Sequence, residues 1–120
     1  MLVVDDEPSI RMLCRLNLEL EGYAVLEAVS VPAAREALAT HHVDVVLVDV
    51  HVGAHDGRDL IRELRAAGDT PRCALLTGSV QLSLEDRAGA DDVIEKPFSL
   101  ETLVATVRRL AGRDVDSSMI

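Results

Sequence analysis

The stretch that decides the fold is residues 43–49, which read Val43-Asp-Val-Val-Leu-Val-Asp49. From Val43 to Val48 the chain is almost entirely aliphatic and mostly β-branched, and only Asp44 interrupts the run. An apolar strand without polar alternation is typical of a central strand in a parallel sheet that is covered on both faces. The run ends on a carboxylate, Asp49, where the strand should leave the sheet.

Shorter apolar runs lie on both sides of this strand, and segments of helical periodicity separate them. The predicted strands are Met1–Val4, Ala24–Leu26, Val43–Val48, Cys73–Leu76 and Asp92–Ile94. The predicted helices are Ser9–Glu21, Val31–Thr40, Gly57–Ala67, a short one near Leu82–Ala88, and Leu100–Ala111. Expected N-caps are Ser30 and Ser99, and expected helix stops are Gly22, Gly68 and Gly112. This alternation predicts an α/β fold with one doubly wound, five-stranded parallel sheet and five helices.

The composition indicates one small domain with an aliphatic core. The chain has 120 residues, a formal charge of −9 and only two aromatic side chains, Tyr23 and Phe98. We expect a domain over residues 1–112 and a polar tail or linker stub over 113–120. The acidic charge argues against direct nucleic-acid contact, and no apolar run is long enough to predict a membrane span or a signal peptide, so we expect a cytoplasmic protein.

The two cysteines, Cys14 and Cys73, lie among apolar neighbours. Such cysteines are usually buried and reduced in cytosolic proteins. A disulfide or a metal pair is the less favoured alternative, because no nearby Cys or His has the spacing of a metal site. His41-His42 is likewise expected to be a turn before the third strand rather than a metal site.

Polar residues follow the predicted strands, and in a doubly wound sheet the carboxyl ends of the strands form the ligand-binding edge. The residues expected at this edge are Asp5 and Asp6 after the first strand, Asp49 after the third, Thr77 after the fourth, and Glu95 and Lys96 after the fifth. Lys96 is the only lysine, since the other cations among the twelve are arginines. Three carboxylates, a hydroxyl and a compact ammonium are therefore predicted to converge.

Carboxylates that lie this close repel one another, by about 4 kcal/mol at ~4 Å and an effective dielectric near 20. Either one is protonated or a cation lies between them. A set of hard oxygen ligands suits Mg²⁺, which commonly takes one or two carboxylates and keeps several waters. The alternative is that the aspartates cap helices: Asp6 could cap the first helix, with Pro8 near its first turn. Capping explains one aspartate but not three at separate strand ends.

A metal-bound carboxylate beside a lysine and a threonine fits phosphoryl transfer, in which the protein positions groups and neutralises charge. Asp49 is the predicted nucleophile and would form an acyl phosphate. Lys96 would pair with one phosphoryl oxygen, and the Thr77 hydroxyl would donate to another. A cis Lys96–Pro97 bond could aim the lysine, although residue type alone does not establish it.

Several runs together resemble the receiver domains of bacterial two-component response regulators. They are Leu2-Val-Val-Asp-Asp-Glu-Pro8, Val45-Val-Leu-Val-Asp49, Asp56-Gly57, Leu75-Leu-Thr-Gly78 and Gly89-Ala-Asp-Asp-Val-Ile-Glu-Lys-Pro-Phe98, and the resemblance covers Leu2 to about Ala111. It implies a flavodoxin-like fold and a phosphoacceptor signalling domain rather than an enzyme. Asp49 matches the phosphorylated aspartate, and Thr77 and Lys96 match the side chains that contact the phosphoryl group.

The same resemblance implies the metal ligands and the partners. Asp6, Asp49 and the backbone carbonyl of His51 match the direct Mg²⁺ ligands, and Asp5 matches a ligand that acts through water. The phosphodonor would be a sensor histidine kinase or a histidine phosphotransfer protein, the domain would be a monomer or weak homodimer, and Lys96–Pro97 would be cis.

The chain departs from the family pattern at four places. Val52-Gly53 replaces a Met-Pro pair, and His55 replaces a further Met. His51 lies at a position that influences water attack on the acyl phosphate, although an exposed loop histidine is an equally good interpretation. Val93 replaces an aromatic that changes rotamer with the threonine, which predicts a muted switch. Thr77 to Lys96 is shorter than usual by roughly one helical turn.

Three other functions compete with this hypothesis. A phosphatase of the haloacid-dehalogenase type also uses an aspartate nucleophile with Mg²⁺, but it needs a second aspartate where this chain has His51. A nucleotide- or flavin-binding module lacks support because no Gly-rich phosphate loop is present. An interaction domain with a vestigial site is disfavoured by the complete set of site residues.

Overall fold

The computed structural model describes residues 1–68, 71–78 and 87–112. Its five-stranded parallel sheet has the order β2-β1-β3-β6-β7. The strands are β1 (Leu2–Val4), β2 (Leu26–Ala28), β3 (Val45–Asp49), β6 (Arg72–Thr77) and β7 (Asp92–Glu95), and an antiparallel pair, β4 (His51–Val52) and β5 (His55–Asp56), follows β3. The helices are α1 (Pro8–Leu20), α2 (Val31–Thr40), α3 (Gly57–Ala66) and α4 (Leu100–Leu110).

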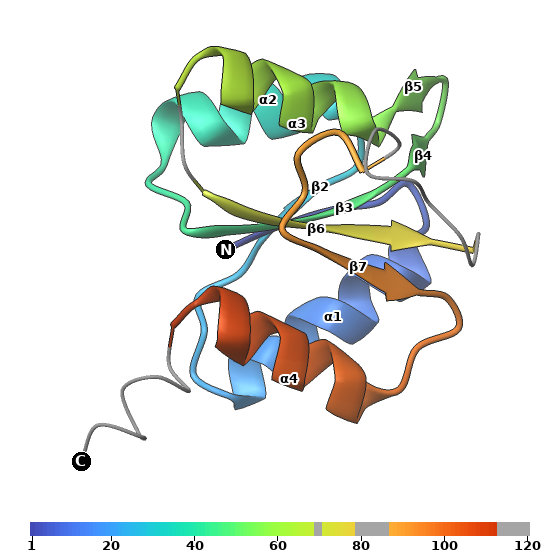
Figure 1. Cartoon of the computed structure of the whole chain (residues 1–120). Coiled ribbons are helices and arrows are strands. Elements are labelled where there is room, and N and C mark those ends of the chain that lie inside the picture. Colours follow the sequence, from blue (N-terminus) through green and yellow to red (C-terminus); the bar gives the residue numbers. More distant parts are fainter. Residues whose placement is uncertain (69–70, 79–86, 113–120) are drawn as a thin grey trace.

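Helices cover both faces of the sheet (Figure 1). Helices α2 and α3 lie on one face, and α1 and α4 lie on the other. Strand β3 is central and alternates between the two layers: Val46 and Val48 pack on the side of α2 and α3, whereas Val45 and Leu47 pack on the side of α1 and α4. The prediction of a β3 strand buried on both faces is confirmed.

The predicted fold class is confirmed, with corrections at two places. The second strand is Leu26–Ala28, not Ala24–Leu26. Met1 makes hydrogen bonds to the Ala24 carbonyl and the Leu26 amide, but the paired register runs from Leu2 with Leu26 to Val4 with Ala28. The β4–β5 hairpin was not predicted; Gly53, with φ of +60°, lies in its turn.

Two predicted segments fall mainly outside the described residues. The short helix expected near Leu82–Ala88 lies there except for its last two residues, which are in a turn. The tail expected over 113–120 lies there entirely. Within the described ranges the structure contains four of the five expected helices.

The helix ends follow the predicted signals with one exception. The Ser30 and Ser99 hydroxyls accept hydrogen bonds from Ala33 and Thr102 amides, so both N-caps are confirmed. The glycines expected to stop helices, Gly22, Gly68 and Gly112, all have positive φ. Asp6 does not cap α1, because the N-cap is Glu7 and no side chain caps it, while Pro8 is the first helical residue.

The remaining expectations about composition concern membranes and cysteines. Among the described helices, none combines the length and apolar character needed to cross a membrane. Cys14 and Cys73 are free thiols and both are buried, as predicted. They lie in different layers, Cys14 with α1 and α4 and Cys73 with α2 and α3, so the sheet separates them.

Candidate functional site

The three predicted carboxylates meet at the carboxyl edge of the sheet. Asp5 and Asp6 follow β1, and Asp49 is the last residue of β3, the neighbouring strand. One oxygen from each carboxylate can be chosen so that all three lie within 4.8 Å of one another. Asp5 is fully buried, Asp49 is half-buried and Asp6 is exposed. Among the described residues, this is the one group of three or more potential ligands with such spacing.

Lys96 joins two of these carboxylates. Its Nζ donates to Asp5 Oδ2 at 3.1 Å and to Asp49 Oδ2 at 2.9 Å, although the residues are 91 and 47 positions apart in the chain. The Lys96–Pro97 bond is cis, as the resemblance implied. The sole lysine of the chain therefore lies at the predicted edge of the sheet, where β1, β3 and β7 end.

The electrostatics of this cluster follow from burial and charge. Burial raises the pKa of Asp5, and hydrogen bonds from the Glu7 amide and Lys96 oppose this increase without cancelling it. Burial acts to lower the pKa of Lys96, but hydrogen bonds to Asp49 and Asp5 outweigh it, so this pKa lies above its usual value. The pKa of Asp5 is therefore raised mainly by burial, whereas the pKa of Lys96 is raised because its contacts with two carboxylates together outweigh burial.

Thr77 lies directly beside Lys96. It is the last residue of β6 and is 4% exposed. Its carbonyl accepts from the Lys96 amide at 2.7 Å, and in the parallel register it pairs with Glu95. All five side chains of the predicted site therefore come from the same edge of the sheet.

The β4–β5 hairpin closes one side of the carboxylate cluster. The Gly53 amide donates to Asp6 Oδ2 at 3.2 Å, and the His51 amide donates to Asp49 Oδ1 at 3.3 Å. Both His51 and His55 are exposed, as expected for a solvated histidine, but His51 lies in strand β4 rather than in a loop. The hairpin links the two carboxylates that come from different strands.

Gly57 allows α3 to begin directly against the end of β3. A Cβ at this position would lie 1.9 Å from the Asp49 carbonyl oxygen and 2.7 Å from Val48 Cγ2. The Gly57 amide also donates to the Val50 carbonyl at 2.8 Å. No larger residue fits without a shift of the backbone that carries Asp49.

Val93, which replaces the aromatic residue of the family pattern, is half-buried and packs against the layer of α2 and α3. It pairs with Leu75 in the β6–β7 register. Its effect on switching stays a prediction, because residues 79–86, between Thr77 and Lys96, lie outside the described residues.

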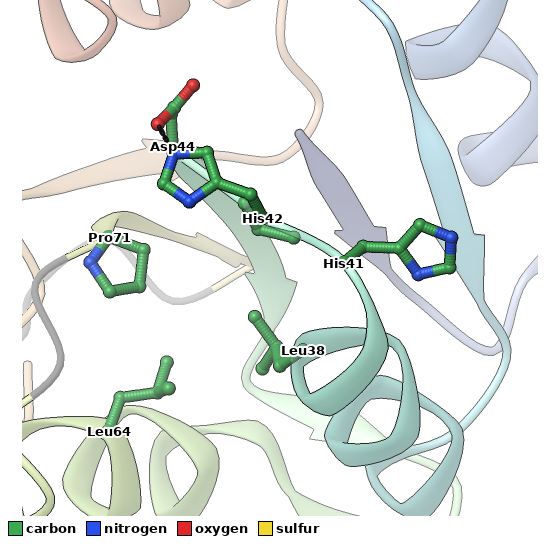
Figure 2. A pocket seen from close by; sticks show the side chains of 7 residues that line it. Leu38, His41, His42, Asp44, Leu64 and Pro71 are labelled. Atoms are coloured by element: carbon green, nitrogen blue, oxygen red, sulfur yellow. Dashed lines mark ion pairs between the residues drawn. The ribbon is translucent and has the colours of Figure 1, made fainter.

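A hollow of about 310 Å³ lies at the opposite, amino-terminal edge of the sheet. It is lined by Leu38, His41, His42, Val43, Asp44, Leu64 and Pro71. Figure 2 shows the His42 ring beside Asp44, while the His41 ring points away from both. His42 Nε2 lies 2.8 Å from Asp44 Oδ1. The two imidazoles therefore diverge within the connection between α2 and β3.

Two contacts of the site were not predicted. One is the close approach of Gly57 to Asp49, for which the Asp56-Gly57 pair was a sequence signal without an assigned reason. The other is Arg11, whose Nη1 donates to the Asp5 carbonyl at 2.7 Å. Nothing in the residue pattern of α1 marked this arginine, because the contact depends on how α1 crosses the end of β1.

Comparison with known proteins agrees with this geometry. The family described as "Response regulator receiver domain" matches residues 1–108. The "Response regulator MprA" proteins of Mycobacterium sp. (strain KMS) and Mycobacterium ulcerans are each 37% identical over 115 residues, which cover 93% of this chain and 50% of the relative. The chain thus spans about half the length of these curated relatives.

Solved structures with the same fold include receiver domains from several bacteria. The Francisella response regulator 1452 receiver domain has a TM-score of 0.84 at 27% identity and covers 94% of this chain and 96% of its own. The receiver domain of NtrX from Brucella abortus has a TM-score of 0.84 at 29% identity, with coverage of 92% and 96%. A response regulator from Thermotoga maritima has a TM-score of 0.80 at 31% identity, with coverage of 92% and 95%.

Proposed function

The chain belongs to the family of response regulator receiver domains, and on that premise we propose that it accepts a phosphoryl group on Asp49 in a Mg²⁺-dependent reaction. The observation that carries the proposal is the arrangement of one ammonium, Lys96, between Asp5 and Asp49 at 3.1 and 2.9 Å. Asp6 completes an acidic cluster that a divalent cation would neutralise.

The donor set fits Mg²⁺. Three carboxylates with oxygens within 4.8 Å of one another are hard ligands, and their mutual repulsion makes a divalent cation favourable. Asp6 and Asp49, with the backbone carbonyl of His51, are the proposed direct ligands, and Asp5 the one that acts through water. When bound, Mg²⁺ would withdraw charge from the oxygens of the transferring phosphoryl group.

The residues around Asp49 have separate proposed tasks. An Asp49 carboxylate oxygen attacks the phosphorus, a P–O bond forms as the donor's P–N bond breaks, and the imidazole leaves with the donor. Lys96 then pairs with a phosphoryl oxygen, and the Thr77 hydroxyl donates to another. The proposed donor is a sensor histidine kinase or a histidine phosphotransfer protein.

The proposed output is a change of conformation. Phosphorylation adds charge and three acceptor oxygens at the edge where β1, β3, β6 and β7 end, which would shift an existing equilibrium between two states. The domain would act as a signalling domain, a monomer or weak homodimer, without direct contact to nucleic acid.

The test is mass spectrometry of the intact protein after incubation with acetyl phosphate and Mg²⁺. We expect one phosphoryl group on the wild type and none on Asp49→Ala. The matched control is Asp44→Ala, which removes an exposed aspartate at the opposite edge and should leave labelling unchanged. Labelling of Asp49→Ala at the wild-type level would refute the proposal, and sustained turnover of a generic phosphoester would favour the phosphatase.

A further inference from the structure

The two adjacent aspartates after β1 share one peptide unit, and a single side chain holds it. The carbonyl of Asp5 belongs to the peptide that joins Asp5 to Asp6, and it accepts from Arg11 Nη1 at 2.7 Å. The β1–β2 register ends at Val4 with Ala28, and the Asp5 amide donates to the Ala28 carbonyl at 3.2 Å. The Asp5 carbonyl therefore lies beyond the end of the ladder, where a buried acceptor needs another partner.

Arg11 is built into this position by α1 and β2. It lies in the first turns of α1, its side chain is only 15% exposed, and its Nε lies 3.4 Å from Glu27 Oε1 on β2. A charge-assisted hydrogen bond at 2.7 Å is among the stronger ones that a neutral carbonyl accepts. The guanidinium thus joins α1, the end of β1 and β2 at one peptide.

The partner of Arg11 also affects the charge at the cluster. Because Glu27 offsets the guanidinium charge, Arg11 can donate to the Asp5 carbonyl while repelling a cation at the carboxylates less than an unpaired arginine would. Arg15, one turn along α1, also pairs with Glu27, at 3.0 Å, and is 38% exposed. Arg11 therefore contacts both the Asp5 carbonyl and Glu27, whereas Arg15 pairs with Glu27.

We infer that Arg11 is a positioning residue for the metal: by fixing the Asp5–Asp6 peptide, it holds both carboxylates in the orientation that binds a divalent cation. This inference rests on the proposed Mg²⁺-dependent function. A hydrogen bond that orients ligating groups typically changes metal affinity about tenfold or more when it is lost.

The test measures Mg²⁺ affinity of the whole chain by calorimetric titration, without any phosphodonor. Arg11→Met keeps the aliphatic stem and the helix propensity but removes the donors. We expect its Mg²⁺ dissociation constant to rise about tenfold. Arg15→Met, which also removes a partner of Glu27, should stay within about twofold of the wild type, a ratio that corresponds to about 0.4 kcal/mol.

The melting temperature of each apo protein separates positioning from general stability. Arg11→Met and Arg15→Met each lose one ion pair with Glu27, so both should have a somewhat lower melting temperature than the wild type. Only Arg11→Met should lose Mg²⁺ affinity. Arg11→Lys, which keeps one cationic donor, should bind Mg²⁺ more tightly than Arg11→Met. If Arg11→Met does not fold, Arg11→Lys decides the question. A lysine lacks the rigid fork of donors with which Arg11 contacts the Asp5 carbonyl and Glu27 together, so Arg11→Lys should bind Mg²⁺ more weakly than Arg15→Lys.

The outcomes distinguish this inference from the proposed function. Wild-type affinity in Arg11→Met, or equal affinities in Arg11→Lys and Arg15→Lys, would overturn the role of Arg11 alone, provided that Asp6→Asn abolishes binding. If Asp6→Asn binds Mg²⁺ as well as the wild type does, the metal site itself is wrong, and the inference about Arg11 fails with it.

Discussion

At the scale of single residues, Lys96 holds two carboxylates that have different proposed tasks. Its ammonium contacts Asp49, the proposed acceptor, and Asp5, a proposed metal residue. The same positive charge that would stabilise a phosphoryl oxygen also competes with a divalent cation for these carboxylates. The two tasks can therefore be separated by removing the charge.

Lys96→Met keeps most of the side-chain stem and removes the ammonium. We expect labelling by acetyl phosphate to fall about tenfold or more, because a hydrogen bond to a charged group contributes about 1.5–3 kcal/mol. Mg²⁺ affinity should be equal to or higher than that of the wild type, since one competing cation is lost. Initial labelling rates and calorimetry measure the two effects.

The control for Lys96→Met is Arg72→Met, which removes a cation whose side chain is 63% exposed, at the opposite end of β6. It should change neither labelling nor Mg²⁺ affinity. Equal labelling of Lys96→Met and the wild type would show that the ammonium has no part in the transfer.

At the scale of elements, the start of α3 controls where β3 ends. Gly57→Ala places a Cβ 1.9 Å from the Asp49 carbonyl oxygen, a distance that requires the backbone of β3 or α3 to move. We expect a loss of about 1–3 kcal/mol of unfolding free energy, the usual cost of overpacking, despite the better helix propensity of alanine. Urea denaturation measures this loss.

Gly78→Ala is the matched control for Gly57→Ala. A Cβ at Gly78 meets nothing within 4 Å, and the backbone there does not have a positive φ. Its unfolding free energy should stay within about 0.5 kcal/mol of the wild type, as for most substitutions without close contacts. If Gly57→Ala is as stable as Gly78→Ala, the close approach of α3 to Asp49 is wrong.

The sequence predicted elements and strand ends well where an apolar run stops at a polar residue. Asp5, Asp49 and Thr77 were identified this way, because parallel strands bring such residues to one edge. Contacts that depend on how elements cross could not be predicted. Arg11 lies six residues after Asp5, yet its contact with that carbonyl depends on the path of α1.

At the scale of the whole molecule, the sheet divides the core into two layers, and each contains one free cysteine. Cys14 packs with α1 and α4, and Cys73 packs with α2 and α3. Burial raises the pKa of both thiols to about 11. A folded-state pKa above that of the unfolded chain favours the protonated thiol in the native state, so this contribution to stability is fully present below about pH 9 and is lost as the pH rises through 11.

The thiols therefore report whether the two layers unfold together. At pH 8 a thiol with a pKa of about 11 is in the thiolate form about 100-fold less often than a thiol with the ordinary pKa of 9.0. Burial also keeps an alkylating reagent away from both thiols. Each thiol can be followed alone, because Cys73→Ala keeps only Cys14 and Cys14→Ala keeps only Cys73. We expect iodoacetamide to modify the remaining thiol of each variant only when the protein unfolds. After correction for the stability of each variant, the two modification rates should show the same dependence on urea, because β1, β3 and β6 contribute side chains to both layers. Rapid modification of one thiol in the absence of urea, with the other still protected, would instead mean that the layer containing the reactive thiol opens independently of the sheet.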